Sequence, residues 1–184
     1  MPICHEKSGI FNASVLGIKT HVGRKNPPNP KWPAKYDRVV VLVRDPFDAL
    51  LAEFNRQHSQ NQTGFASDEK FEQHWNTYLA KTIEFWKGFH TFFKAEYKSH
   101  QVMFVSYEKL TKNLIEELKN VLAFLGYSLP KNVADCVKVN REGLFHRVKP
   151  VVDQMKYFNA EQKVVLTATR DDVYKKIGIK NWKK

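Results

Sequence analysis

The stretch RVVVLVRDPFDALLAEFNR, residues 38–56, decides the fold class. Its first part, residues 38–44, is an unbroken run of mostly β-branched residues between two arginines. Such a run is typical of a parallel strand that is buried on both faces. Asp45-Pro46 then ends the strand and opens a helix, expected over residues 47–57, because proline fits the first turn, where its missing N–H has no helical partner. The stretch therefore predicts a strand that leads directly into a helix.

The rest of the chain repeats this alternation. Further strands are predicted over residues 15–21 and 101–107, and further helices over residues 68–97, 110–125, 133–137 and 159–174. Strands that alternate with helices indicate an α/β fold with a parallel sheet flanked by helices. The length of 184 residues fits a single domain. Within it we expect a proline-rich loop over residues 22–36 and a polar loop over residues 58–68.

Aromatic residues mark one face of the predicted helix over residues 68–97. They recur at alternating spacings of four and three: Phe71, Trp75, Tyr78, Thr82, Phe85, Phe89 and Phe92. This period is typical of an amphipathic helix. We interpret the stripe as the face that packs into the core, and not as a set of ligand contacts.

The net charge of the chain indicates which classes of binding partner to expect. The formal net charge is +11, which favours an anionic partner such as a nucleotide, a sulfated glycan, a nucleic acid or an acidic membrane surface. Nucleic-acid binding has only charge in its favour, since no recognition helix, RNP-like strand or arginine-rich arm is present. No apolar run approaches the length of a membrane span, so the chain as given is predicted to be soluble.

The cysteines do not suggest a metal site. Only Cys4 and Cys136 are present, and neither they nor the histidines have the spacing of zinc ligands. We therefore predict no bound metal. Two cysteines could form one disulfide or none, and the sequence does not decide between these.

Three polar clusters directly follow the three predicted strands: Lys19-Thr20-His21, Arg44-Asp45-Pro46 and Ser106-Tyr107-Glu108. Open parallel sheets bind their ligands outside the carboxyl ends of the strands. The clusters are therefore expected to line one crevice. A histidine there is suited to accept a proton from a hydroxyl group, and an arginine just before a helix start is suited to bind phosphate. A structural ion pair of Arg44 with Asp45 or Asp48 is the alternative.

All three clusters resemble segments of the sulfotransferases, which use 3′-phosphoadenosine 5′-phosphosulfate as co-substrate. The segment VVVLVRDPFDAL is similar to their 3′-phosphate-binding strand and helix, and a Lys-Thr-His triplet lies upstream at the family's interval. The segments FVSYEKLTKNLIEELKNVLAFLGY and NREGLFHR resemble two later elements of the family. The resemblance covers roughly residues 15–150. It implies a three-layer fold of the P-loop nucleotide hydrolase type.

The resemblance also implies roles for individual residues. His21 takes the place of the catalytic base, and Lys19 that of the lysine that assists at the transferred sulfuryl group. Arg44 takes the place of a 3′-phosphate ligand, and Tyr107 that of the tyrosine that packs near the adenine. The late segment offers further ligands of the nucleotide: Arg141, Gly143 and Arg147. The residues themselves leave open which of the two arginines contacts the 3′-phosphate.

Two departures from the family pattern stand out. Ala52 occupies the position of a serine that also contacts the 3′-phosphate, and a hydrogen bond to an anion is worth about 1.5–3 kcal/mol. Asn55 or Arg56 is a candidate substitute. The second departure is that the family's Pro-Lys-Ser-Gly-Thr loop for the 5′-phosphosulfate is not found upstream, so we expect an N-terminally truncated sulfotransferase domain.

Within the superfamily, LLAEFNR and EGLFHR look most like the sulfotransferase domain of WSC-domain-containing proteins. This likeness implies a hydroxylated, sialylated glycan as acceptor and a location in the Golgi or secretory pathway, although a cytoplasmic location stays open. A catalytically degenerate module that binds nucleotides or polyanions is the alternative function.

Overall fold

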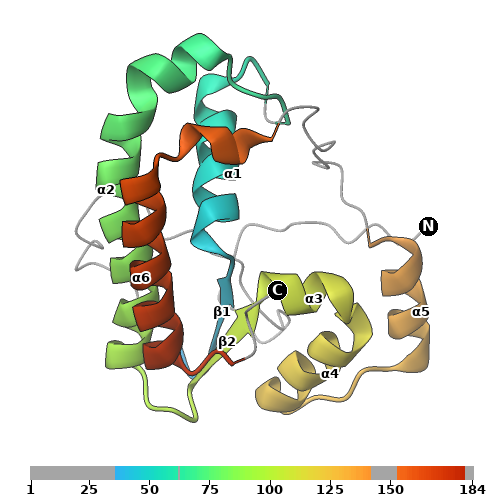
Figure 1. Ribbon diagram of the computed structural model, residues 1–184. Coiled ribbons are helices and arrows are strands. Elements are labelled where there is room, and N and C mark those ends of the chain that lie inside the picture. Colours follow the sequence, from blue (N-terminus) through green and yellow to red (C-terminus); the bar gives the residue numbers. More distant parts are fainter. Residues whose placement is uncertain (1–35, 62, 142–152, 181–184) are drawn as a thin grey trace. The chain divides into compact units, whose positions relative to one another are not determined.

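The computed structural model describes residues 36–61, 63–141 and 153–180, and in this part of the chain two parallel strands form the sheet (Figure 1). Strand β1 (Val39–Val43) pairs with β2 (Val102–Ser106), with Val39 opposite Val102 and Val43 opposite Ser106. The remaining elements are the helices α1 (Pro46–His58), α2 (Asp68–Glu96), α3 (Tyr107–Lys112), α4 (Leu114–Leu125), α5 (Lys131–Val139) and α6 (Ala160–Ile177), and the short 3₁₀ helix η1 (Gln154–Tyr157). The predicted α/β class is confirmed. The strand expected over residues 15–21 and, except for its last residue, the loop expected over residues 22–36 lie outside the described residues.

The junction of β1 and α1 forms as the sequence predicts. Asp45 is the N-cap of α1, and its side chain accepts a hydrogen bond of 3.0 Å from the backbone N–H of Phe47. Pro46 occupies the first helical position, where it removes no helical hydrogen bond. The strand therefore ends and the helix begins within two residues.

Helix α2 buries a different face from the one predicted. Its buried residues are Phe71, Trp75, Leu79, Ile83, Trp86, His90 and Phe93. The predicted stripe is correct only at Phe71 and Trp75, and its later members are half-buried beside the core. The reason is geometric: alternating spacings of four and three average about 3.5 residues per turn, whereas a straight α-helix has about 3.6, so a strict stripe drifts off the buried face.

Helices α2 and α6 lie side by side and close the core together with α1 (Figure 1). Asn159 caps α6 through a capping box with Gln162, which fixes the start of the helix where the sequence predicts it. Leu166 and Val173 of α6 are fully buried. They anchor α6 in the core.

The region after β2 contains two helices where the sequence predicts one. Helix α3 ends at Lys112, and α4 begins at Leu114, because Asn113 has non-helical backbone angles (φ −125°, ψ 50°). Gly126 ends α4 in the left-handed conformation (φ 89°), as predicted. Helix α5 is longer at both ends than the predicted range 133–137.

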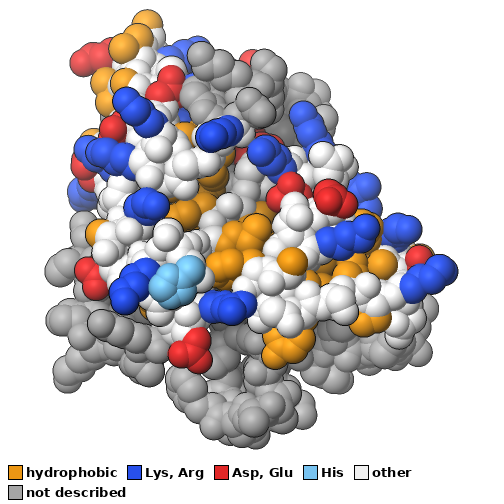
Figure 2. All heavy atoms as spheres, turned by 90° about the horizontal axis from the view of Figure 1, so that it is seen from below, with side chains coloured by type: hydrophobic (Ala, Val, Ile, Leu, Met, Phe, Trp, Pro, Cys, Tyr) orange, Lys and Arg blue, Asp and Glu red, His pale blue; other side chains and the backbone are white. Residues whose placement is uncertain are grey.

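Strand β1 is buried on alternate residues and not on both faces. Val41 and Val43 are buried, whereas Val40 and Leu42 are 38% and 50% exposed. Figure 2 shows a face of the molecule on which hydrophobic side chains are surrounded by lysines and arginines, in line with the net charge of +11. None of the described helices combines the length and the apolar composition that a membrane crossing requires.

Candidate functional site

The strand ends bring Arg44 and Tyr107 together. Because Val43 pairs with Ser106 in a parallel ladder, the next residue of each strand emerges at the same edge of the sheet. The Arg44 guanidinium lies 4.8 Å from the centroid of the Tyr107 ring. The Nε of Arg44 is buried and has no hydrogen-bond partner in the structure as described. The site therefore holds a buried cationic donor whose hydrogen bond is unsatisfied in the described structure.

Glu108 connects the ends of β1 and β2 through hydrogen bonds. Its Oε1 accepts a hydrogen bond of 2.8 Å from the backbone N–H of Asp45, and its Oε2 accepts one of 2.7 Å from the hydroxyl of Ser106. The Ser106 hydroxyl in turn caps α3 by accepting from the backbone N–H of Lys109. The sequence marks Glu108 as part of a polar cluster but does not reveal this structural role.

Asp45 pairs with Arg170 of α6 and not with Arg44. The distance from Arg170 Nη1 to Asp45 Oδ2 is 3.3 Å. Burial raises the pKa of the Asp45 carboxyl, and its hydrogen bond from Phe47 and the charge of Arg170 oppose this shift. An ion pair of Arg44 with Asp48 is also not found among the described residues. The sequence gives no signal for Arg170, which lies 125 positions after Asp45.

Ala52 lies on α1 two turns after the N-cap, and the polar residues that follow it are already engaged. Asn55 is buried and exchanges hydrogen bonds with Gln154, and its Oδ1 also accepts from the backbone N–H of Ala66. Arg56 donates from its Nε to Glu53 Oε2 at 2.7 Å. To replace the serine expected at position 52, Asn55 would have to give up its buried hydrogen bonds, and Arg56 would have to leave its more exposed pair with Glu53.

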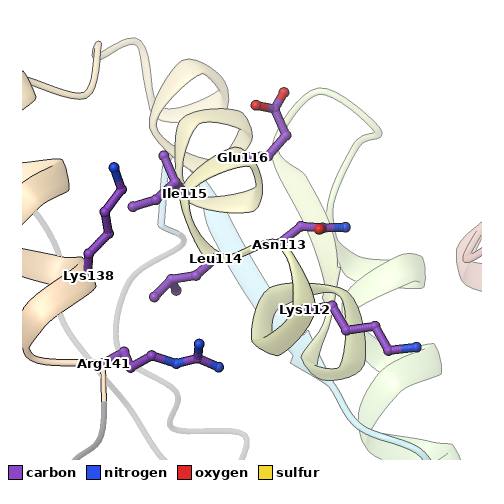
Figure 3. A pocket seen from close by; sticks show the side chains of 7 residues that line it. All are labelled: Lys112, Asn113, Leu114, Ile115, Glu116, Lys138 and Arg141. Carbon is purple, nitrogen blue, oxygen red and sulfur yellow. The ribbon is translucent and has the colours of Figure 1, made fainter.

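Arg141 lies at the opposite end of α3 from Tyr107. Its Nη2 donates a hydrogen bond of 3.2 Å to the carbonyl oxygen of Thr111. Its side chain lines an open cavity of about 460 Å³ together with Lys112, Asn113, Leu114, Ile115, Glu116 and Lys138 (Figure 3). Helix α3 has six residues, which corresponds to a length of about 9 Å. Arg44 and Arg141 thus mark the two ends of this short helix.

The other predicted site residues lie outside the described residues: Lys19, His21, Gly143 and Arg147. Their positions relative to Arg44 and Tyr107 remain predictions. In the described ranges, no group of three or more His, Cys, Asp or Glu side chains is arranged to hold a metal ion.

The chain was compared with protein-family models, with curated proteins and with solved structures. The family model described as the sulfotransferase domain matches residues 12–183. A WSCD family member of Aedes aegypti is 28% identical over 173 residues, which cover 92% of this chain and 52% of the relative. A WSCD family member of Drosophila pseudoobscura pseudoobscura is 29% identical over 176 residues, which cover 93% of this chain and 53% of the relative. The chain thus spans about half the length of the curated relatives that it matches.

A solved structure supports the fold. The crystal structure of mouse sulfotransferase SULT7A1 complexed with PAP matches with a TM-score of 0.56 over 74% of this chain and 58% of that chain. The sequence identity is 16%, so this likeness concerns the arrangement of strands and helices alone. It supports the predicted P-loop-like sheet flanked by helices.

Proposed function

Because this chain belongs to the sulfotransferase domain family, we propose that it transfers a sulfuryl group from 3′-phosphoadenosine 5′-phosphosulfate to a hydroxyl acceptor. The observation that carries the proposal is the buried Nε of Arg44, which has no hydrogen-bond partner in the described structure. A buried donor without an acceptor costs about 1–3 kcal/mol. A phosphate group of the donor would supply that acceptor.

The proposed nucleotide site assigns one part of the donor to each described residue. Arg44 binds the 3′-phosphate, since guanidinium groups pair well with phosphate oxygens. Tyr107 is 36% exposed and supports the adenine end, with the Arg44 guanidinium against its ring. Arg141, Gly143 and Arg147 supply the remaining ligands of the nucleotide. PAP in the mouse sulfotransferase is a ligand of this chemical type.

The proposed reaction uses the two residues of the upstream triplet. His21 accepts the proton of the acceptor hydroxyl, and the hydroxyl oxygen then forms a bond to the sulfur. The bond between that sulfur and the 5′-phosphate oxygen breaks, and adenosine 3′,5′-bisphosphate leaves. Lys19 neutralises the negative charge that develops on the bridging oxygen.

For the acceptor we propose a glycan that carries hydroxyl groups, such as a sialylated one, in the Golgi or secretory pathway. The support for the acceptor is the net charge of +11, which favours an anionic surface or chain. The support for the compartment is the similarity to the WSCD family members.

A second candidate function is a module that binds a nucleotide or polyanion without chemistry. Ala52 favours it, because Asn55 and Arg56 of the next turn already have partners in Gln154 and Glu53. Such a module would bind the product nucleotide, with reduced affinity, and would not turn over the donor.

Calorimetric titration of the full chain with adenosine 3′,5′-bisphosphate tests the proposed site. Arg44→Ala is expected to raise the Kd by at least about tenfold, since it removes a charge-assisted hydrogen bond. Arg38→Ala is the matched control, because Arg38 flanks β1 at its other end and lies over the Phe124 ring. An unchanged Kd for Arg44→Ala would exclude the assigned role.

Transfer of labelled sulfate from the donor to a glycan acceptor tests the chemistry. His21→Ala is expected to abolish transfer and to leave the Kd of the bisphosphate unchanged. Binding without any transfer by the unmodified chain would favour the non-catalytic module. Equal loss of binding and transfer in His21→Ala would contradict its role as the base.

A further inference from the structure

Arg170 of α6 reaches the edge of the sheet from the far end of the chain. Its Nη1 lies 3.3 Å from Asp45 Oδ2, and its Nε lies 3.1 Å from Asp171 Oδ1. Its guanidinium carbon is 5.9 Å from the centroid of the Phe47 ring. The side chains of Arg170 and Asp45 are only 17% and 21% exposed. This ion pair is therefore largely shielded from water, unlike the solvent-exposed pairs on the surface.

Asp45 is held from three sides. Its Oδ1 accepts the hydrogen bond from the N–H of Phe47 at the start of α1, and its Oδ2 pairs with Arg170. Its backbone N–H donates to Glu108 of α3. The peptide unit that links Arg44 to Asp45 is thus fastened to α3 on one side and, through Arg170, to α6 on the other.

Helix α6 is anchored in the core next to this contact. Val173 and Tyr174, which follow Arg170 within about one turn, are 0% and 2% exposed and pack into the core. The Arg170 side chain therefore extends from an anchored helix and not from a loop. Because Arg44 directly precedes Asp45, movement of Asp45 would shift Arg44 relative to the Tyr107 ring.

We propose that Arg170 is a positioning residue for the donor site, which holds Asp45 and thereby fixes Arg44 against Tyr107. This inference rests on the proposed nucleotide site. Arg170 acts through Asp45 and does not itself contact the nucleotide. The role explains why an arginine of α6 is paired with the N-cap of α1.

The test compares Kd values for adenosine 3′,5′-bisphosphate in Arg170→Gln, Asp45→Asn and the double variant. Simple electrostatics predicts opposite effects, because Arg170→Gln removes a positive charge and Asp45→Asn removes a negative one near an anionic ligand. If Arg170 positions Asp45, both single substitutions should raise the Kd by about five- to tenfold. The Kd of the double variant should then be no higher than that of either single variant. Asn remains a good N-cap, so α1 keeps its start in Asp45→Asn.

Three further variants complete the design. Lys176→Gln removes a positive charge from an exposed ion pair with Asp172 on the same helix and measures the effect of charge alone. Arg170→Lys keeps the charge and is expected to restore most of the affinity. In the Arg44→Ala background, Arg170→Gln is expected to have no additional effect. The free energy of unfolding by urea is measured for each variant to verify that it is folded.

The outcomes separate the two hypotheses. Tighter binding in Asp45→Asn, or equal losses in Arg170→Gln and Lys176→Gln, would overturn the positioning role. A further loss of affinity on adding Arg170→Gln to Arg44→Ala would overturn it as well. If Arg44→Ala itself leaves the Kd unchanged, the proposed nucleotide site is wrong.

Discussion

At the scale of single residues, the site divides into contacts that the sequence predicts and contacts that it cannot. Arg44 and Tyr107 follow paired strands, so their proximity is a consequence of the parallel register. The pair of Asp45 with Arg170 joins residues 125 positions apart. No periodicity or motif links them, because their contact depends on how α6 packs against the core.

Ala52→Ser is a prediction at this scale. The serine hydroxyl would restore a hydrogen bond to the 3′-phosphate, and we expect the Kd for adenosine 3′,5′-bisphosphate to fall by about tenfold. Titration calorimetry measures the change. Ala80→Ser, at an exposed position of α2, controls for the effect of serine in a helix. An equal Kd in Ala52→Ser and the original chain would show that position 52 does not face the phosphate.

At the scale of elements, strands and helix ends are predictable, whereas helix faces and breaks are less so. The two described strands, Asp45-Pro46 and Gly126 carry local signals, and each of these features forms where it is predicted. The prediction of which face of α2 is buried is wrong beyond Trp75, because aromatic residues that lie outside the core continue the predicted spacing. The interruption between α3 and α4 at Asn113 could not be predicted from a proline or a glycine, because neither stands at this position. Helices α3 and α4 on either side of the break both contact β2.

The packing of α2 against β1 predicts a pH-dependent stability through His90. His90 is 4% exposed, and its Nδ1 lies 2.7 Å from the carbonyl oxygen of Trp86. Burial lowers the pKa of His90 from 6.5 to about 4, against hydrogen bonds with the backbone of Trp86 and Leu42. The unfolded chain therefore binds a proton between these two pH values that the folded chain does not bind. The free energy of unfolding should fall as the pH decreases through this window, by up to about 1.4 kcal/mol per pH unit.

His90→Phe removes this titration and keeps an aromatic ring in the core. Urea unfolding at a series of pH values between about 4.5 and 7.5 should show a shallower decline for His90→Phe than for the original chain. His100→Phe, at an exposed position after α2, should leave the slope unchanged. Identical slopes for His90→Phe and the original chain would mean that His90 is not kept neutral by burial.

At the scale of the whole molecule, the chain spans about half of the relatives that it matches and carries a net charge of +11. The described residues contain the candidate site around Arg44 and Tyr107. The predicted base His21 and its neighbour Lys19 lie outside them. Charge on the surface and a built nucleotide site are separate sources of anion binding, and they respond differently to salt.

We predict that salt separates these two kinds of binding. Lysines and arginines on the surface attract a polyanion through charges that are screened within about 10 Å at 0.1 M salt, so affinity for a sulfated glycan should fall at least a hundredfold between about 0.05 and 0.5 M NaCl. In the proposed site the bisphosphate contacts Arg44, which is only partly exposed and therefore screened less, so its affinity should fall about tenfold or less. Calorimetric titrations at several salt concentrations measure both slopes. Arg44→Ala provides the internal control, because it should lose the bisphosphate and retain the glycan. Parallel salt slopes for the two ligands, with equal sensitivity to Arg44→Ala, would instead indicate that one surface binds both of them.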